Sequence, residues 1–419
     1  MEKLIQYENG LKAVIDTVRG VKSVAAGIWV NVGSAKETPA QNGLSHFTEH
    51  VIFKGTDKLD GYGIADAFET LGAHVNAFTG KECTCYYVKS TDEYKKECFA
   101  LLSHIFFDSV FNEEELDKER NVILEEINMV EDTPEDICYD LLASAFYGGS
   151  ALGQTILGNP DNIKAFKQKD VIDFTNRFYC AQNVVISFAG NITPAQADKL
   201  IRQYILPKIC VKNSGASPVA ALPVRRTHTQ RIKDFEQSNI AIGFSSLPFN
   251  SAKNQVQNIL NIILGGGMSS RLFQAIREKL GLAYSVYSAP SAFKNNGSFN
   301  IVLNISPENT QKALDALSQE IRKVLCGDIT AKEIARAKTQ IKSALVFARE
   351  NVQSIMSVNG KLLTLCGELY DVDKRIAQID AVTADDVNRF AAAIFKNANL
   401  ATSYVGKPHT ANFPDFFQK

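Results

Sequence analysis

Residues 170–190 read DVIDFTNRFYCAQNVVISFAG, and residues 386–406 read DVNRFAAAIFKNANLATSYVG. In each stretch, apolar residues at a helical period lead into a turn and then a short apolar run, so each is expected to form a helix followed by a strand. Any two helix–strand units look somewhat alike, but the repeated identities in one gapless register favour an internal duplication. At a constant offset of 216 (386 − 170) the identical pairs include Asp170/Asp386, Val171/Val387, Phe174/Phe390, Asn183/Asn399 and Gly190/Gly406.

A weaker echo supports two homologous halves. EELDKER (114–120) pairs with KEIARAK (332–338) at an offset of 218 (332 − 114). The chain of 419 residues is also too long for one compact core and suggests about two to four domains. Segment 207–223, PKICVKNSGASPVAALP, combines Pro, Gly, Ser and Asn near the midpoint and is the expected linker. The predicted organisation is therefore a first half at 1–206 and a second half at 224–419.

Both halves mix strands and helices in irregular order. The alternating segments 24–32, 82–90 and 298–305 predict strands, and the longer periodic segments 113–130 and 331–349 predict helices. Neighbouring strands look like hairpin partners and do not alternate regularly with helices. This pattern favours an α+β fold, with a mixed or antiparallel sheet and packed helices in each half, over a doubly wound parallel sheet.

Composition excludes several classes of protein. Hydrophobic residues make up 45% and charged residues 22%, which is typical of globular domains and excludes global disorder. The 45 Lys and Arg balance 46 Asp and Glu, so no basic surplus exists for a nucleic acid or an anionic membrane. No apolar run approaches the ~20 residues that cross a bilayer, and the start, MEKLIQYENG, lacks the features of a targeting peptide. We therefore expect a cytoplasmic protein without nucleic-acid or membrane partners.

The eight cysteines are too dilute for a disulfide scaffold and indicate a reducing compartment. Cys83 and Cys85 share one face of a predicted strand, but they lack further ligands at the spacing of a metal site. We interpret them as ordinary thiols.

The segment NGLSHFTEHVIFKGT (42–56) contains His46, Glu49 and His50. It reads as a short helix, on which His50 lies about 40° from His46 and Glu49 lies about 60° to the other side. Two histidines one turn apart supply two of the three protein ligands of a catalytic Zn²⁺, and the glutamate beside them can accept a proton from water at the metal. With 6 His and 46 acidic residues in 419 positions, chance gives only about 0.01 such patterns, so unrelated histidines at helical spacing are a weak explanation.

A third ligand is expected from FNEEELDKERNVILEEINMVED (111–132). Glu119 and Glu126 are seven residues apart and project within about 20° of each other on the flank of an apolar stripe. Carboxylates in that position are costly to bury unless a cation compensates, and a zinc ion would. A solvated glutamate is the usual alternative, and spacing does not choose between Glu125 and Glu126 as ligand.

At His46–His50 the sequence resembles the pitrilysin family of metallopeptidases, the inverzincins with the motif H-x-x-E-H. Further blocks look like those of the family and follow in the same order: HFTEHVIFKGT, GAHVNAFTGKECTCYY, KERNVILEEI, ALGQTILGNPDNIKAF and GGGMSSRLFQAIREKLGLAYSVYS. The resemblance runs from about Leu4 to Gly406. It is closest to the short bacterial members and to the beta subunit of mitochondrial processing peptidase. It implies two homologous α+β halves that enclose a substrate chamber, the second half without a metal motif.

The resemblance implies a role for each residue of the motif. His46, His50 and Glu126 match the zinc ligands, for one Zn²⁺ per chain. Glu49 matches the catalytic base, and Glu119 matches the supporting acid of its helix.

The resemblance also implies substrate-binding residues. Asn76, Ala77 and Phe78 in VNAFT match the edge strand on which family members dock substrate as an added strand. Arg277 and Tyr284 in IREKLGLAY match an Arg–Tyr pair of the second half that completes the substrate site. Taken alone, Arg277 would be a surface arginine and Tyr284 a strand aromatic.

The sequence therefore predicts a zinc-dependent endopeptidase that hydrolyses peptides or unfolded or leader segments. The alternative is a proteolytically silent scaffold or partner subunit, and the intact His46, Glu49, His50 and Glu126 argue against it. One chain carries both the zinc motif and the Arg–Tyr pair, which favours a homodimer over a heterodimer with a related chain.

Overall fold

The computed structural model describes residues 2–211, 227–395 and 400–413. The predicted linker at 207–223 lies outside the described residues from position 212 onward. No helix in the described part of the chain is both long and apolar enough to span a membrane. The chain divides into two compact units of discontinuous segments, the first being 1–127, 155–218 and 346–370 and the second 128–154, 219–345 and 371–419.

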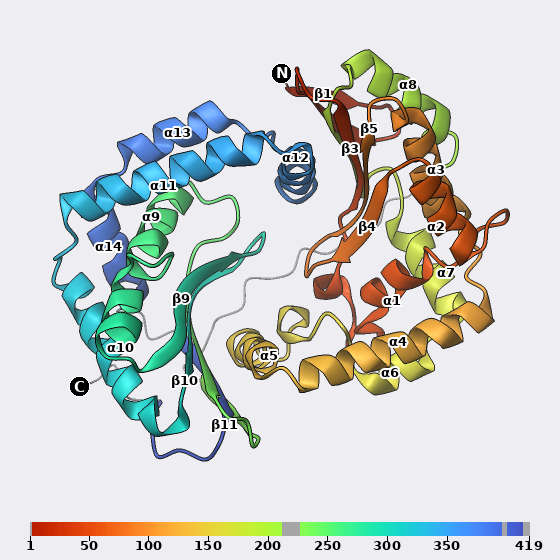
Figure 1. The fold of residues 1–419 in the computed structure, drawn as a ribbon. Coiled ribbons are helices and arrows are strands. Elements are labelled where there is room, and N and C mark those ends of the chain that lie inside the picture. Colours follow the sequence, from red (N-terminus) through yellow and green to blue (C-terminus); the bar gives the residue numbers. More distant parts are fainter. Residues whose placement is uncertain (1, 212–226, 396–399, 414–419) are drawn as a thin grey trace. The chain divides into compact units, whose positions relative to one another are not determined.

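The first unit is built on a mixed sheet (Figure 1). Among the described residues the strand order is β1-β2-β6-β3-β5-β4, and β2 and β6 are its parallel pair. The edge position of β4 leaves one side of that strand without a partner strand. The strands are β1 (Glu2–Gln6), β2 (Lys12–Thr17), β3 (Ser23–Val30), β4 (His74–Thr79), β5 (Thr84–Thr91) and β6 (Val184–Gly190).

Helices cover both faces of this sheet, because alternate strand residues on each face are apolar. On one face, strand residues such as Ile28 and Phe188 pack against the apolar stripes of several helices in the main core of the unit. Those helices are α1 (Leu44–Val51), α2 (Gly61–Thr70), α3 (Lys95–Asp108), α4 (Glu113–Glu131), α6 (Pro160–Ala165), α7 (Gln168–Phe178) and α8 (Pro194–Tyr204).

The other face is covered by α12 (Val352–Cys366), which belongs to the second half of the sequence. Two glycines allow its close approach. A Cβ on Gly27 of β3 would lie 2.4 Å from the sulfur of Met356, and one on Gly360 would lie 2.1 Å from the indole nitrogen of Trp29. The rigid Trp29 ring leaves no room for a Cβ at Gly360, so that position requires glycine, whereas a Cβ at Gly27 would force the Met356 side chain to shift.

The second unit repeats this architecture (Figure 1). Its strand order in the described residues is β7-β11-β8-β10-β9, and β7 and β11 are the parallel pair. The order and directions match those of β2-β6-β3-β5-β4, as an internal duplication predicts. The strands are β7 (Thr227–Ile232), β8 (Ser238–Ser245), β9 (Ala283–Ala292), β10 (Gly297–Ile305) and β11 (Leu400–Gly406).

The helices of the second unit also lie on both faces of its sheet. One face is covered by α5 (Pro134–Tyr147), which comes from the first half of the sequence and packs on β11 and β8. The two halves thus exchange helices, since α12 packs on the first sheet. The remaining helices are α9 (Asn254–Leu264), the π-helix η4 (Phe273–Lys279), α10 (Thr310–Leu325), α11 (Ala331–Arg349), α13 (Val372–Ala381) and α14 (Ala384–Phe395).

The predicted α+β class is confirmed, and the predicted elements lie within two residues of the observed ones. The segments 24–32, 82–90 and 298–305 correspond to β3, β5 and β10, and 113–130 and 331–349 correspond to α4 and α11. The two helix–strand repeats correspond to α7 with β6 and α14 with β11, although residues 396–399 of the second copy are outside the described residues.

Candidate metal centre

Helix α1 carries His46, Glu49 and His50. It is anchored to the core by the buried side chains of Leu44, Phe47 and Val51. The N-cap, Gly43, has a φ of 101°, in the left-handed region that glycine adopts without strain.

The buried carboxylate of Glu37 fixes the start of this helix. It accepts hydrogen bonds from the backbone N–H groups of Gly43 (2.8 Å) and Ser45 (2.6 Å). The first N–H groups of a helix have no partner within the helix, so an acceptor at this point satisfies them and orients the first turn. His46 directly follows Ser45.

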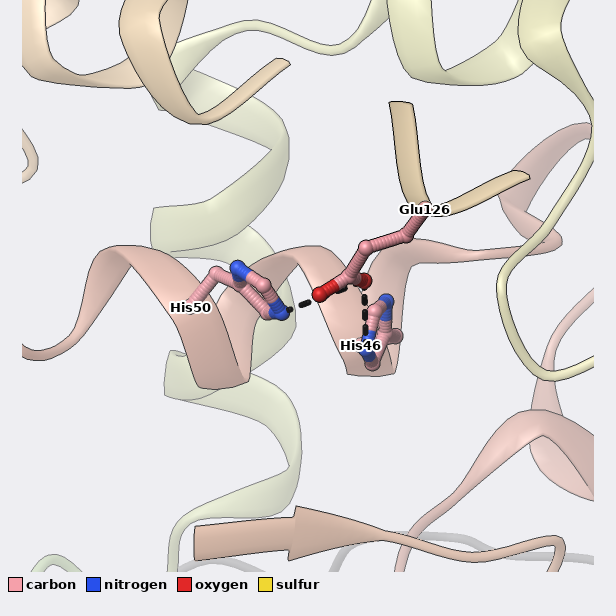
Figure 2. A group of neighbouring side chains, drawn as sticks. All are labelled: His46, His50 and Glu126. Atoms are coloured by element: carbon pink, nitrogen blue, oxygen red, sulfur yellow. Dashed lines mark ion pairs between the residues drawn. The ribbon is translucent and has the colours of Figure 1, made fainter. Parts of the chain in front are cut away.

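His46, His50 and Glu126 converge on one point (Figure 2). The Nε2 atoms of His46 and His50 lie 3.7 Å and 3.6 Å from Oε2 of Glu126 on α4. The ligand atoms of the three residues all lie within 4.8 Å of one another, and no other such group of three occurs in the described part of the chain. Ligands that each lie ~2.0–2.2 Å from a shared zinc ion must be gathered in this way. The structure brings Glu126, and not Glu125, to the two histidines.

Glu119 holds His50 from the opposite side. Its Oε2 lies 3.1 Å from Nδ1 of His50, and its Oε1 lies 2.7 Å from the ammonium group of Lys54. An ionised carboxylate only accepts hydrogen bonds, so Nδ1 of His50 donates to Glu119, and Nε2 is the ring nitrogen that faces Glu126. Burial raises the pKa of Glu119, but the hydrogen bonds from His50 and Lys54 outweigh burial and lower it.

The carboxylate of Glu49 is also held in place. Its Oε2 accepts a hydrogen bond from the hydroxyl of Thr79, at the end of β4. Burial raises the pKa of Glu49, and the hydrogen bond from Thr79 and the charge of His50 reduce this shift without reversing it. A general base with a raised pKa is better matched to neutral pH than an ordinary glutamate.

The residues present fit a zinc ion. Burial, followed by the neighbouring charge of His50, lowers the pKa of His46 to about 4, so its imidazole is neutral at pH 7. Burial also lowers the pKa of His50, but hydrogen bonding to Glu119 and the charges of Glu126 and Glu49 raise it overall. Those same negative charges attract a dication. Two imidazoles and a carboxylate form the ligand set of several catalytic zinc sites.

The five residues that were predicted to bind substrate lie partly in the first unit and partly in the second. Asn76, Ala77 and Phe78 lie on β4, the edge strand of the first sheet. In the second unit, the guanidinium carbon of Arg277 lies 5.8 Å from the ring centroid of Tyr284, so the two form a cation–π pair. Arg277 is on the π-helix η4, a type of turn that is frequent at functional sites, and Tyr284 is 71% exposed on β9. The roles of all five in substrate binding stay predictions.

Sequence reasoning missed three residues that hold the motif. Lys54 falls four residues after His50, within the block that resembles the family, and its spacing could have indicated a neighbour of the site. Thr79 directly follows Phe78, so strand alternation could have placed it on the face opposite Phe78. Glu37 lies in a connecting segment without regular periodicity, and no pattern in the sequence indicates its role.

Comparisons with known proteins match nearly the whole chain. Residues 13–160 match the family described as insulinase (peptidase family M16), and residues 165–341 match the M16 inactive domain. A Bacillus subtilis protein named as an uncharacterized zinc protease, YmxG, is 38% identical over 398 residues, which cover 94% of this chain and 96% of the relative. A protein of the same description from Streptomyces coelicolor is 36% identical over 91% of this chain and 84% of its own length.

Solved structures share the fold. A protease from Helicobacter pylori matches with a TM-score of 0.91 and 21% identity, covering 97% of this chain and 99% of the other. A chain of Complex III2 from Candida albicans matches with a TM-score of 0.83 and 19% identity, covering 96% and 95%. The insulinase match contains the H-x-x-E-H segment, and the inactive-domain match covers much of the second half. The resemblance inferred from the sequence is thus confirmed, and the chain belongs to peptidase family M16, the insulinase or pitrilysin family of zinc proteases.

Proposed function

We propose that this protein is a zinc-dependent endopeptidase that hydrolyses peptides or the unfolded or leader segments of proteins. The observation that carries the proposal is the convergence of His46, His50 and Glu126 in a spacing that suits a metal ion, with the held carboxylate of Glu49 on the same helix. The names of the relatives as zinc proteases support the same class of reaction.

Each residue of the centre has a distinct task in this proposal. His46, His50 and Glu126 hold the zinc ion, which when bound polarises the scissile carbonyl and lowers the pKa of water. Glu49 accepts the proton of the attacking water and passes it to the leaving amine. Glu119 orients the ring of His50 through Nδ1, and Thr79 orients the carboxylate of Glu49.

The substrate is proposed to dock as an added strand along the open side of β4. The Gly80 N–H donates to the Cys83 carbonyl at 2.8 Å, so Gly80 faces β5. Directions alternate along an antiparallel strand, so Val75, Ala77 and Thr79 turn their N–H and C=O groups to the open side. The N–H of Ala77, which donates to Oδ1 of Asn76, agrees with this assignment. A peptide laid along β4 would pair by main-chain hydrogen bonds, which accept varied sequences.

The proposal also covers the role of Arg277 and Tyr284, the oligomeric state and the cellular compartment. Arg277 and Tyr284 would supply side-chain contacts to the substrate. Because one chain carries these residues and the metal centre, we propose a homodimer of self-sufficient subunits, with a heterodimer as the alternative. All eight cysteines are free, which supports the cytoplasm as the proposed compartment.

Metal analysis combined with peptide digestion tests the proposal. Purified protein is expected to hold one zinc per chain and to cleave members of a mixed peptide library, detected by mass spectrometry. Glu49→Gln is expected to keep the zinc and lose turnover by about 10²–10⁴-fold, because the amide cannot accept the proton. His50→Ala is expected to lose the zinc. A zinc-loaded wild type that cleaves no peptide would instead favour the scaffold alternative.

A further inference from the structure

A hollow of about 700 Å³ lies beside β4, at the end of the strand opposite to Thr79. It is bounded by the end of α2, the start of β4, strand β5 and the beginning of α12, all within the first unit. Its volume is within the range of small-molecule and side-chain pockets. The polar and aromatic residues among its lining are Phe68, Glu69, His74, Asn76, Tyr87 and Gln353.

The lining favours a cation. Glu69 is the acidic residue among the described residues that line the hollow, and it is exposed near the C-terminus of α2, which ends at Thr70. The last carbonyl groups of a helix carry a partial negative charge, which adds to that of the carboxylate. The ring of Tyr87 offers an aromatic surface to a cation, and the amides of Asn76 and Gln353 offer oxygen acceptors.

The strand fixes the distance between this hollow and the metal centre. Thr79 contacts Glu49, whereas the strand residues that line the hollow are His74, Val75 and Asn76. These lie three to five positions from Thr79 (79 − 76 and 79 − 74). At ~3.3 Å per residue, an extended peptide on β4 covers that distance with about the same number of residues.

We propose that this hollow is a subsite for a positively charged group of the substrate, three to five residues from the scissile bond. The group is the side chain of Lys or Arg or the free amino terminus of the peptide, and Glu69 is the specificity-determining residue that recognises it. The inference rests on the proposed peptidase function, because it assumes that a peptide lies along β4.

A positional peptide series tests the subsite. The host is an N-acetylated neutral peptide that the wild type cleaves at one bond, and single Lys, Ala or Glu residues replace each position on both sides of that bond. Binding to the zinc-loaded Glu49→Gln variant is measured by fluorescence anisotropy, and kcat/KM is measured with the wild type. We expect Lys to exceed Ala by about two- to fivefold at one position three to five residues from the bond, the size expected of an exposed ion pair.

Substitutions at Glu69 decide whether the hollow is responsible. In the Glu69→Gln background the Lys-to-Ala ratio is expected to fall to about one, and in Glu69→Lys the preference is expected to change to Glu at the same position. Asp66→Asn is the matched control, because it removes the same charge from the same helix at a residue outside the lining. It is expected to leave the ratio unchanged.

A second arm separates the two sources of the charge. Peptides without Lys are shortened so that their first residue occupies the preferred position. The binding of each is compared with a free amino terminus, which is charged, and with an N-acetylated one, which is not. The inference is overturned if no position in the predicted range prefers Lys and the free amine has no effect. It is equally overturned if Asp66→Asn removes the preference as completely as Glu69→Gln. If the wild type cleaves no peptide, the proposed function fails. The anisotropy series is then run on an N-acetylated neutral peptide that the zinc-loaded Glu49→Gln variant binds, and it accepts or rejects the Glu69 subsite on binding alone.

Discussion

Glu125 and Glu126 are neighbours in the chain, yet their side chains leave α4 about 100° apart. The carboxylate of Glu126 lies within 3.7 Å of both histidines of α1. At the scale of single residues, the choice of ligand is therefore made by the packing of α4 against α1. The 36% exposure of the Glu126 side chain leaves it accessible to an incoming ion.

Paired substitutions test that assignment. Glu126→Gln is expected to weaken zinc retention by about tenfold or more, because an amide is a poorer ligand than a carboxylate, whereas Glu125→Gln should retain zinc as the wild type does. The measurement is zinc content after dialysis against a graded series of chelator concentrations. Loss of zinc in Glu125→Gln alone would place the ligand one residue earlier in the helix.

At the scale of elements, the contact between α12 and the first sheet depends on a missing side chain. Gly360→Ala is expected to destabilise the fold by about 1–3 kcal/mol, because the new Cβ would overlap the Trp29 indole. Gly267→Ala is the control, since a Cβ there meets no atom within 4 Å. Urea unfolding of both variants provides the comparison. Equal urea midpoints for the two variants would show that α12 shifts to accommodate the new Cβ without loss of stability.

The start of α11 predicts how stability depends on pH. Oε1 of Glu333 lies 2.7 Å from Nε of Arg271, and Oε2 of Glu333 accepts a hydrogen bond from the backbone N–H of Thr330. Burial raises the pKa of Glu333, but these hydrogen bonds outweigh burial and lower it from 4.5 to about 2. The pair thus stabilises the fold above pH 4.5, and this contribution is lost as the pH falls toward 2.

Comparison with Glu333→Gln isolates this contribution. The wild type should lose stability between pH 4.5 and 2 more steeply than the variant, as measured by urea unfolding at a series of pH values. Parallel curves for the two proteins would contradict the assignment.

The limits of the helices and strands were more predictable from the sequence than the elements against which they pack. The period of α4 and α11 predicted their limits closely, because a continuous apolar stripe is a local property. The motif of His46 and His50 was likewise readable, since its geometry lies within one turn. An apolar stripe does not say which sheet covers it, and so the exchange of α5 and α12 was not predicted. The choice of Glu126 and the position of Glu37 also depend on tertiary packing, which spacing does not encode.

At the scale of the whole molecule, the two sheets share one topology but differ in chemistry. The metal-ligand group found in the described residues belongs to the first unit, whereas the second unit presents the exposed Tyr284 beside Arg277. The two units thus share a strand order, whereas the candidate zinc ligands of the described residues lie in the first unit.

Variants of the second unit test whether it takes part in turnover. Tyr284→Phe is expected to lower turnover by about 10²–10³-fold if its hydroxyl donates to the substrate, with zinc content unchanged. Arg277→Ala should act in the same direction, and the double variant should lose less than the product of the single losses, because the pair acts as a unit. Peptide turnover is measured beside zinc content. Wild-type turnover in both single variants would assign the second unit a structural role.

The helix exchange has a consequence for biosynthesis. A ribosome delivers β3 long before it delivers α12, so the face of the first sheet that carries Trp29 stays uncovered until the segment Val352–Cys366 has emerged. During that interval an apolar surface is open to chaperones and to other nascent chains. Trp29 is the single tryptophan of the chain and is 1% exposed in the finished fold. Its fluorescence therefore reports when the second half of the chain has returned to cover the first.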